Sequence, residues 1–598
     1  MAIINENPGE HLRCLLMMHE LPGDQVANVR NPPRGLRGWI TRIEEKLTRQ
    51  VFPDIRTASH VRGNRVAQDY LFQALLGHNQ SAHFSFVVEE PKRSQFEQWA
   101  AKGSHGDGHR PIEVHSAIEL REPGLDRIAP DIWLDLRGQA DYGLRVRDQL
   151  SSSVYPVVSL QHGLADPSLL YDYFLRIMLT PTYACDSLVC TSRASKKALA
   201  NIFEEMSASF KEQFGTSLGF AGRLDLIPLC VDTDLFQPLD KSQARKQLGI
   251  PNDSVVLLYI GYLSLIKADF APLLPMIRKL ADDNPNIDLR LILAGTGPDS
   301  YSKSLLVLIQ ELHLQKHVSL LREVSDKSKH LLFGAADVFV APCDSLHESF
   351  GLTPIEAMAY GVPQVVADWD GYRDTVSHGE TGFLVPTCWG RCDRELHGTG
   401  ELFGWVYDHT LMSQSVSLDI EYMRDCLQTL IRNPDLRSKM SQQSRTRAVA
   451  EFGCPKVAYQ YDQLWGELSA IARTQERYRK SRRFDQIAYF NIFGHFSTTQ
   501  LTDQCVIRTT SNGLLPIPKI TSLAETELQM HVFDDALLDQ IIQDLSPAEG
   551  NTGGKSAGQI LSQMTNETRS TEMVRRHILL LLKHGKVEVI SSPGANSQ

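Results

Sequence analysis

Short apolar runs alternate with amphipathic helical stretches along most of the chain. From about residue 60, such runs occupy residues 83–90, 132–138, 155–163 and 187–192, with helical patterns between them. Short buried strands that alternate with helices are typical of β-α-β units, which place their strands in one parallel sheet. The pattern therefore predicts a doubly wound α/β domain in the first part of the chain.

A second series of the same kind begins near residue 222. Its apolar runs occupy residues 225–231, 255–261, 289–295, 317–321, 337–343 and 363–368. Ligands of such sheets bind outside the carboxyl ends of the strands. Two doubly wound domains in one chain therefore predict a cleft between them that holds a ligand.

The pattern changes after a predicted helix at residues 452–472. Residues 473–483 read RTQERYRKSRR, with six basic residues in eleven. This composition is typical of a solvated linker, and a weak contact with a membrane surface or a partner is the alternative. Residues 484–598 form a smaller α-rich unit that ends in MVRRHILLLLKHGKVEVI, which predicts a helix, a glycine turn and a strand.

Composition excludes several classes of protein. The 598 residues are 42% hydrophobic and 22% charged, which excludes wholesale disorder, and the length exceeds what one core holds. The net charge of −10 is spread along the chain, so we expect no nucleic-acid partner.

Location and metal content are predicted from what the sequence lacks. No apolar run reaches the ~18 residues of a membrane span, and the N-terminus lacks the basic and apolar pattern of a signal peptide. The ten cysteines include no CxxC pair. We therefore expect a cytoplasmic protein with reduced cysteines and no metal site.

The segment with the most chemical information is residues 341–386. Thr353 fits a helix N-cap, Glu356 its capping-box partner, and Gly361 the end of the helix. The helix N-terminus would then point at the mouth of the sheet, where its free N–H groups form a site for a phosphate or diphosphate. Two carboxylates, Glu348 and Glu356, flank that site.

This segment, ESFGLTPIEAMAYGVPQV from Glu348, resembles the donor-site signature of retaining GT-B glycosyltransferases. The family is the large one that includes sucrose synthase and bacterial mannosyl- and glucosyltransferases, with a pattern like E-x-F-G-L-x-x-x-E-A-M-A-x-G-x-P-V. The resemblance implies that Glu348 contacts the donor sugar and Glu356 the ribose of the nucleotide. It also implies a diphosphate-binding backbone at Ser349, Phe350, Gly351 and Leu352. Without the rest of the motif, Glu356 could equally be a residue that only caps the helix, and Glu348 could equally be an acid of a surface loop.

Weaker matches extend over most of residues 60–472. IPLCVDTDLFQP (227–238) is similar to the interdomain hinge of the family, and FGCPKVAYQYDQLW (452–465) to its last helix, which crosses back onto the first domain. Gly63 and Asn64 occupy the place of the glycine loop of the family, which implies donor contact. SLQHGLADP resembles the loop that contains a histidine, which places His162 near the reacting sugar; a histidine satisfied at a strand end is the alternative.

One position departs from the family pattern. After the first strand of the second domain, the family usually has Gly-Arg-Leu followed by Lys-Gly, whereas this chain has GYLSLIKA at 261–268. Lys267 is in place and is expected to meet the diphosphate, but Tyr262 replaces the arginine. The change predicts lower activity, a different donor, or compensation by Arg322 or Arg373.

We therefore predict an α/β protein of the GT-B fold. Its parts are an acceptor domain at 1–220, a donor domain at 221–452, a crossing helix and basic linker at 453–483, and a module at 484–598 that loosely resembles a winged helix. The stretch SAGQILSQMTNETR has one basic residue, so we expect this module to bind a protein partner, an acceptor peptide or a second copy of the chain rather than DNA.

The predicted activity is metal-independent transfer of a sugar, with retention of configuration, from a nucleotide-diphosphate sugar. The acceptor is a glycan, a lipid, a small molecule or a protein, and the nucleotide sugar is a co-substrate, so no further cofactor is expected. The predicted catalytic residues are Glu348, Lys267 and His162. The alternatives are another GT-B enzyme, such as an epimerase or a phosphorylase, and a non-catalytic scaffold.

Overall fold

The computed structural model describes most of the chain. The described residues are 12–18, 63–79, 82–101, 112–121, 123–165, 172–346, 348–477, 488–498, 500–511, 534–546, 554–566 and 569–591. They divide into two compact units. The larger comprises Met1–Val88 and Ser94–Arg477, and the smaller comprises Glu89–Arg93 and Tyr478–Gln598.

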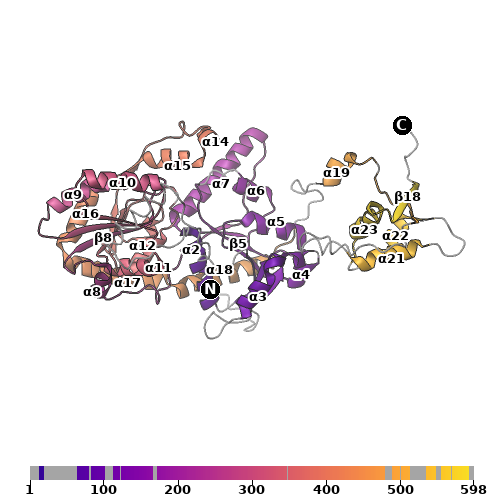
Figure 1. Cartoon of the computed structure of the whole chain (residues 1–598), viewed down its shortest axis with the longest axis horizontal. Coiled ribbons are helices and arrows are strands. Elements are labelled where there is room, and N and C mark those ends of the chain that lie inside the picture. Colours follow the sequence, from indigo (N-terminus) through magenta and orange to yellow (C-terminus); the bar gives the residue numbers. More distant parts are fainter. Residues whose placement is uncertain are drawn as a thin grey trace. The chain divides into compact units, whose positions relative to one another are not determined.

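The first sheet of the larger unit, of which β5 is labelled in Figure 1, has seven parallel strands in the order β3-β2-β1-β4-β5-β6-β7. The strands are β1 (Leu12–Met17), β2 (Ala82–Val88), β3 (Glu113–Ser116), β4 (Ile132–Asp135), β5 (Val157–Gln161), β6 (Ser187–Cys190) and β7 (Arg223–Leu226). Strands β4, β5 and β6 are buried along their whole length, which explains their continuous apolar runs. The order reverses at β1, between β2 and β4.

Helices cover this sheet. They are α2 (Gly63–His78), α3 (Arg93–Ala101), α4 (Gly124–Ile128), α5 (Ala140–Leu150), α6 (Phe174–Leu179) and α7 (Arg193–Phe214). The long helix α7 begins with a capping box in which the side chains of Ser192 and Ser195 bond to each other's backbone N–H groups. Its start lies directly after β6, at the carboxyl end of the sheet.

The second sheet has six parallel strands in the order β10-β9-β8-β11-β12-β13. They are β8 (Val255–Tyr262), β9 (Leu289–Thr296), β10 (Val318–Arg322), β11 (Val338–Ala341), β12 (Gln364–Ala367) and β13 (Gly382–Val385). Two doubly wound α/β domains in the larger unit confirm the predicted fold class. One assignment was wrong: the run at 225–231 was expected to open the second series, but its first residues form β7, which pairs with β6 of the first sheet.

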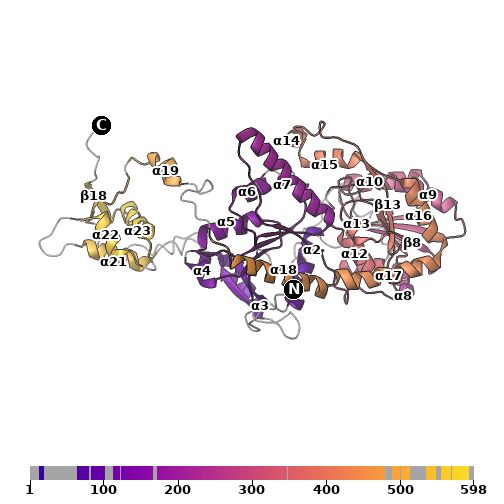
Figure 2. The ribbon, with the colours of Figure 1, turned by 180° about the vertical axis from the view of Figure 1, so that it is seen from behind.

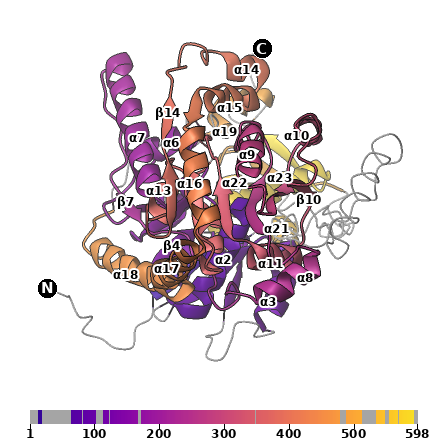
Figure 3. The ribbon, with the colours of Figure 1, turned by 90° about the vertical axis from the view of Figure 1, so that its left-hand side faces the viewer.

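The helices around the second sheet are α8 (Lys241–Leu248), α9 (Leu273–Asp282), α10 (Asp299–Glu311), α11 (Asp326–Ala335), α12 (Leu352–Ala359), α13 (Tyr372–Thr375), α16 (Ile420–Arg432) and α17 (Pro434–Phe452). Helices α9 and α16 lie side by side, as do α8 and α11 (Figure 3). An antiparallel pair, β14 (Thr387–Trp389) and β15 (Val416–Leu418), brackets the helices α14 (Thr399–Phe403) and α15 (Trp405–Gln414). The sequence patterns did not predict this excursion.

The last helix of the larger unit, α18 (Cys454–Ala472), joins its two domains. It packs against α2 of the first domain, whereas α17 packs on α12 of the second (Figure 2). Trp465 is fully buried and meets Phe84 of β2 edge to face, with ring centroids 6.2 Å apart. The helix therefore crosses back onto the first domain, as the resemblance implied.

The smaller unit is built from helices and one small sheet. Its strands β16 (Val506–Thr509), β17 (Lys555–Ser556) and β18 (Val587–Ser591) are antiparallel in the order β17-β16-β18. Its helices are α19 (Tyr489–Phe493), α21 (Asp535–Leu545), α22 (Ala557–Met564) and α23 (Thr571–Lys583). Ile507, Leu537 and Ile578 are fully buried in its separate core. The resemblance to a winged helix stays a prediction.

A buried ion pair fixes the first sheet to its helices. Arg147 of α5 is 2% exposed and Asp186, just before β6, is 1% exposed. Arg147 Nη1 and Nη2 lie 2.5 and 2.8 Å from the two carboxylate oxygens of Asp186. The same carboxylate accepts hydrogen bonds from the backbone N–H groups of Val157 and Tyr183. The pair therefore links α5, β5 and the start of β6.

We expect the substitution Asp186→Asn to lower the free energy of unfolding by about 3–5 kcal/mol, because it leaves the Arg147 charge buried without a counter-ion. Denaturant unfolding measures the change. The exposed pair of Arg278 and Asp282 supplies the control, since Asp282→Asn should cost about 0.5 kcal/mol or less. Equal losses in the two variants would contradict the structural role of the buried pair.

Candidate functional site

Lys267 and Glu348 meet at the carboxyl ends of two neighbouring strands. Lys267 follows β8 and Glu348 follows β11, and these strands are adjacent in the sheet. Lys267 Nζ lies 2.7 Å from Glu348 Oε2, and the two side chains are 22% and 13% exposed. The hydroxyl of Tyr372 donates to the same oxygen at 3.3 Å. Burial lowers the pKa of Lys267, but the charges around it, that of Glu348 foremost, together outweigh burial, and the pKa of Lys267 is raised.

The helix after Glu348 begins differently from the prediction. Helix α12 starts at Leu352, its N-cap is Gly351, and no side chain caps its first turn. The expected capping box of Thr353 and Glu356 is therefore wrong. Gly351 has φ +95°, and a Cβ there would lie 2.5 Å from the Tyr372 ring, so only glycine fits this turn. The turn starts the helix early enough to place Thr353 inside it.

The end of α12 agrees with the prediction. Gly361 has φ +72°, and its N–H donates to the carbonyl of Met358 at 2.9 Å. The N–H of Val362 donates to the carbonyl of Ala357 at 2.9 Å. These two bonds form a Schellman motif, which confirms that Gly361 stops the helix.

Glu356 has a role other than capping. It is completely buried, and its Oε1 accepts hydrogen bonds from Lys329 Nζ at 2.6 Å and from the Tyr70 hydroxyl at 3.1 Å. Its Oε2 is buried and has no hydrogen-bond partner among the described residues. Lys329 lies on α11 and Tyr70 on α2, far from Glu356 in the sequence. No motif pointed to either residue.

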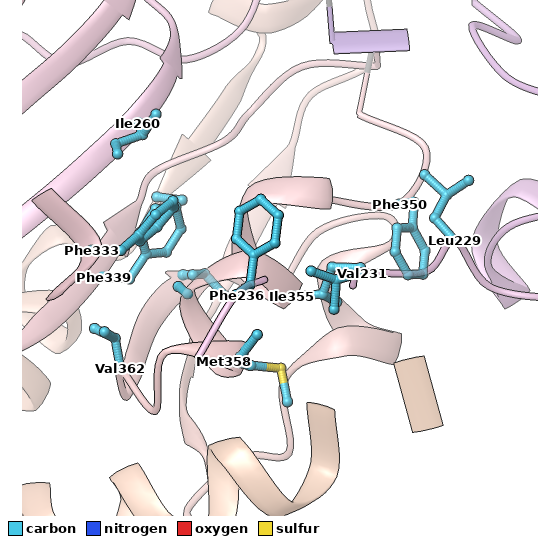
Figure 4. Packing of buried hydrophobic residues seen from close by; sticks show 14 of the residues in the cluster. Leu229, Val231, Phe236, Ile260, Phe333, Phe339, Phe350, Ile355, Met358 and Val362 are labelled. Carbon is cyan, nitrogen blue, oxygen red and sulfur yellow. The ribbon is translucent and has the colours of Figure 1, made fainter. Parts of the chain in front are cut away.

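The loop between the two glutamates contacts the first domain. The carbonyl of Ser349 accepts hydrogen bonds from the side chains of Ser192 at 2.7 Å and Thr191 at 3.3 Å. Phe350 is 1% exposed and lies near Leu229 and Val231 in the core (Figure 4). The Phe350 side chain therefore belongs to the core, and only its backbone is available for donor binding.

His162 lies at the end of β5, next to α2. Its Nε2 is 3.0 Å from Gln68 Nε2. Burial lowers the pKa of His162, against a smaller opposite effect of Asp135. His162 makes no hydrogen bond with Glu348 or Lys267, both of which belong to the described part of the chain.

Gly63 and Asn64 do not form the expected loop. They are the first two residues of α2, the helix that also contains Gln68 and Tyr70. That helix therefore contacts both His162 and Glu356. The predicted residues thus do not form one cluster. The structure places Glu348 with Lys267, Glu356 with Lys329 and Tyr70, and His162 with Gln68.

The suggested replacements for the missing arginine are already paired. Tyr262 ends β8 and is 43% exposed. Arg322 pairs with Asp299 at 2.6 Å and Arg373 with Asp368 at 2.8 Å. Lys329, which pairs with Glu356, is a cation that the sequence comparison did not identify.

Two further acids lie in the loops around Lys267. Asp370 has φ +42° and a buried Oδ1 without a partner among the described residues, and burial, with the nearby Glu348 charge, raises its pKa to about 7. Asp344 is 6% exposed. Burial, with the nearby Asp269 charge, raises the pKa of Asp344 to about 7 as well.

A cavity of about 280 Å³ lies beside Asp344. Its lining consists of Asp269, Pro272, Pro342, Asp344, Gln414, Val416, Ser417, Leu418 and Ile420. None of the sequence-predicted site residues lines it. Among the residues that the structure describes, no group of three or more His, Cys, Asp or Glu side chains could hold a metal ion, and no helix is long and apolar enough to cross a membrane.

The shifted pKa of Asp344 predicts a pH dependence of stability. The pKa of Asp344 is raised from 3.8 to about 7 on folding. Its contribution to the free energy of unfolding is therefore fully present below pH 3.8 and is lost as the pH rises to 7. We expect Asp344→Asn to raise the free energy of unfolding by about 1–3 kcal/mol at about pH 8, and by much less at about pH 4.5. Denaturant unfolding at both pH values measures this. The exposed Asp253→Asn is the control, and a gain that does not vary with pH would contradict the assignment.

Comparison with known proteins gives a partial match. Residues 240–391 match the family model described as Glycosyl transferases group 1. A D-inositol 3-phosphate glycosyltransferase of Streptosporangium roseum is 34% identical over 179 residues, which are 28% of this chain and 40% of that protein. The enzyme of the same name from Mycobacterium tuberculosis is 35% identical over 167 residues, 27% of this chain and 33% of that protein. The matched stretch thus spans less than half of these relatives.

Solved structures resemble the chain over a larger part. The crystal structure of Anabaena Alr3699/HepE in complex with UDP and glucose has a TM-score of 0.46 at 16% identity, and the match covers 76% of this chain and all of that one. Sucrose-phosphate synthase from Thermosynechococcus elongatus has a TM-score of 0.47 at 19% identity, and the match covers 77% of this chain and 100% of that one.

Proposed function

We propose that the protein transfers a sugar from a nucleotide-diphosphate sugar to an acceptor, with retention of configuration and without a metal. The match of residues 240–391 to the family model of glycosyl transferases group 1 supports the proposal. The observation that carries the proposal is the Lys267–Glu348 pair, which lies beside the start of α12 at the carboxyl ends of β8 and β11. This is the edge at which doubly wound sheets bind their ligands.

The donor diphosphate binds where positive charge is concentrated. The first turn of α12 has no side-chain cap, so its N–H groups and the helix dipole are available to an anion. Lys267 supplies a full charge at the same edge. Glu348 then accepts hydrogen bonds from the hydroxyls of the sugar, and Glu356 accepts them from the ribose.

The chemical step breaks the bond between the anomeric carbon and the diphosphate oxygen. The bonding electron pair leaves with the diphosphate, and Lys267 and the α12 N–H groups stabilise the growing negative charge. The acceptor oxygen attacks from the face that the diphosphate leaves, and its proton passes to a diphosphate oxygen. Glu348 orients the sugar and does not form a covalent bond to it.

The rest of the chain supplies the acceptor and the partners in this proposal. Residues 1–220 bind the acceptor, which is a glycan, a lipid, a small molecule or a protein, and residues 221–452 bind the donor. His162 of the first domain lies near the reacting sugar. The crossing helix and the basic linker at 453–483 follow. The linker is solvated, and a weak membrane-surface contact is the alternative. The winged-helix-like module at 484–598 binds a protein partner or a second copy of the chain. The protein acts in the cytoplasm.

Donor turnover tests the catalytic assignment. We expect Lys267→Met and Glu348→Gln each to lower kcat about 10²- to 10³-fold, because each removes a charged group that acts on the leaving diphosphate or the sugar. The measurement is transfer or hydrolysis with a panel of UDP-, GDP- and ADP-sugars. Lys303→Met, on the exposed side of α10, controls for loss of a lysine. Unchanged turnover in Lys267→Met would reject the assignment, and no nucleotide binding by the unaltered protein would favour the non-catalytic scaffold.

A substitution at Tyr262 should strengthen binding of the donor nucleotide instead of weakening activity. We expect Tyr262→Arg to tighten binding of a nucleoside diphosphate about fivefold to tenfold, because a guanidinium makes charge-assisted hydrogen bonds with phosphate. The gain should shrink at high salt, since position 262 is 43% exposed. Calorimetric titration at two salt concentrations measures both effects, with Tyr262→Gln as the uncharged control. An equal gain in the two variants would show that charge is not the cause.

A further inference from the structure

The hydrogen bonds of Glu356 distinguish its two carboxylate oxygens. Oε1 accepts from Lys329 Nζ at 2.6 Å and from the Tyr70 hydroxyl at 3.1 Å. Oε2 is equally buried and has no partner among the described residues. A buried carboxylate oxygen without a donor is costly, yet the described residues donate twice to Oε1 of Glu356 and leave Oε2 without a donor.

Lys329 supplies the charge that a buried carboxylate needs. The Glu356 side chain is completely buried and the Lys329 side chain is 20% exposed. Removing a carboxylate from water without a cation is strongly unfavourable, and Lys329 Nζ, 2.6 Å from Glu356 Oε1, supplies that cation. The Lys329 ammonium also lies 5.8 Å from the centre of the Phe236 ring, which restricts where it can go.

Tyr70 brings the first domain to the same carboxylate. It lies on α2, whereas Glu356 and Lys329 belong to α12 and α11 of the second domain. The Tyr70 ring packs edge to face on Phe236, with centroids 5.7 Å apart, and Phe236 lies in the segment that joins the two sheets. The hydroxyl of Tyr70 is therefore held by its ring and reaches Glu356 only while α2 lies against the second domain.

We infer that Tyr70 and Lys329 are positioning residues that saturate Glu356 Oε1 and direct Oε2 at the ribose hydroxyls of the donor. The inference rests on the proposed function, in which Glu356 meets the ribose. An ionised carboxylate has acceptor capacity on both oxygens; with Oε1 occupied, a hydroxyl donor that enters the site finds Oε2. Because Tyr70 comes from the first domain, recognition of the ribose depends on contact between the two domains.

Discrimination between ribose and deoxyribose tests this inference. The probes are UDP, GDP and ADP and their 2′-deoxy counterparts, titrated calorimetrically into the full-length protein. For the diphosphate that binds most tightly, we expect the unaltered protein to prefer the ribonucleotide by about tenfold or more, as a hydrogen bond to a charged group implies. Tyr70→Phe should reduce this preference about threefold, and Lys329→Met should reduce it at least as much.

The controls separate positioning from general destabilisation. Tyr461→Phe also removes a buried tyrosine hydroxyl, one without a hydrogen-bond partner among the residues that the structure describes, and it should leave the ribose preference unchanged. A loss of stability alone would lower the thermal midpoint without changing the ratio of the two dissociation constants. In turnover assays, Tyr70→Phe should raise the KM for the donor more than it lowers kcat.

The outcomes also separate this inference from the proposed function. If the unaltered protein binds none of the diphosphates, the proposed function fails and the inference fails with it. If it binds them but shows no ribose preference, or if Tyr70→Phe and Lys329→Met both keep the full preference, the positioning roles are overturned while nucleotide binding stands.

Discussion

A carboxylate buried at the mouth of a parallel sheet needs a cation, and the second domain meets this requirement twice. Glu348 is paired with Lys267, which follows the neighbouring strand, and Glu356 is paired with Lys329, which lies on α11. Removing either cation would leave a negative charge in a poorly hydrated position. The two pairs hold the loops after β8 and β11 and the helices α11 and α12 in one arrangement, from which the proposed donor chemistry follows.

The first domain takes part in the same arrangement. Its residue Ser192 holds the carbonyl of Ser349, Tyr70 holds Glu356, and the backbone N–H and side chain of Arg193 both bond to Asp374. Each contact joins the first domain to a loop or helix at the carboxyl end of the second sheet. A change in the contact between the domains would therefore alter the proposed donor site directly.

Much of the fold could be predicted from the sequence, because parallel strands are buried on both faces and appear as continuous apolar runs. The resemblance assigned Glu348 and Lys267 to one donor site, and the structure shows that they follow adjacent strands. Lys329 and Tyr70 could not be found this way: nothing in the local sequence records which helix will face Glu356 in the folded chain. The capping box failed for a local reason, because the left-handed turn at Gly351 starts the helix before Thr353.

The central claim is that a nucleoside diphosphate binds between Lys267, the first turn of α12 and Glu356. The most direct measurement is a crystal structure of the full-length protein with the nucleoside diphosphate that binds most tightly. The account predicts phosphate oxygens against Lys267 Nζ and the N–H groups of the first turn of α12, and a ribose hydroxyl about 2.5–3.2 Å from Glu356 Oε2. A nucleotide bound elsewhere in the chain, with Glu356 Oε2 still unpartnered, would contradict it.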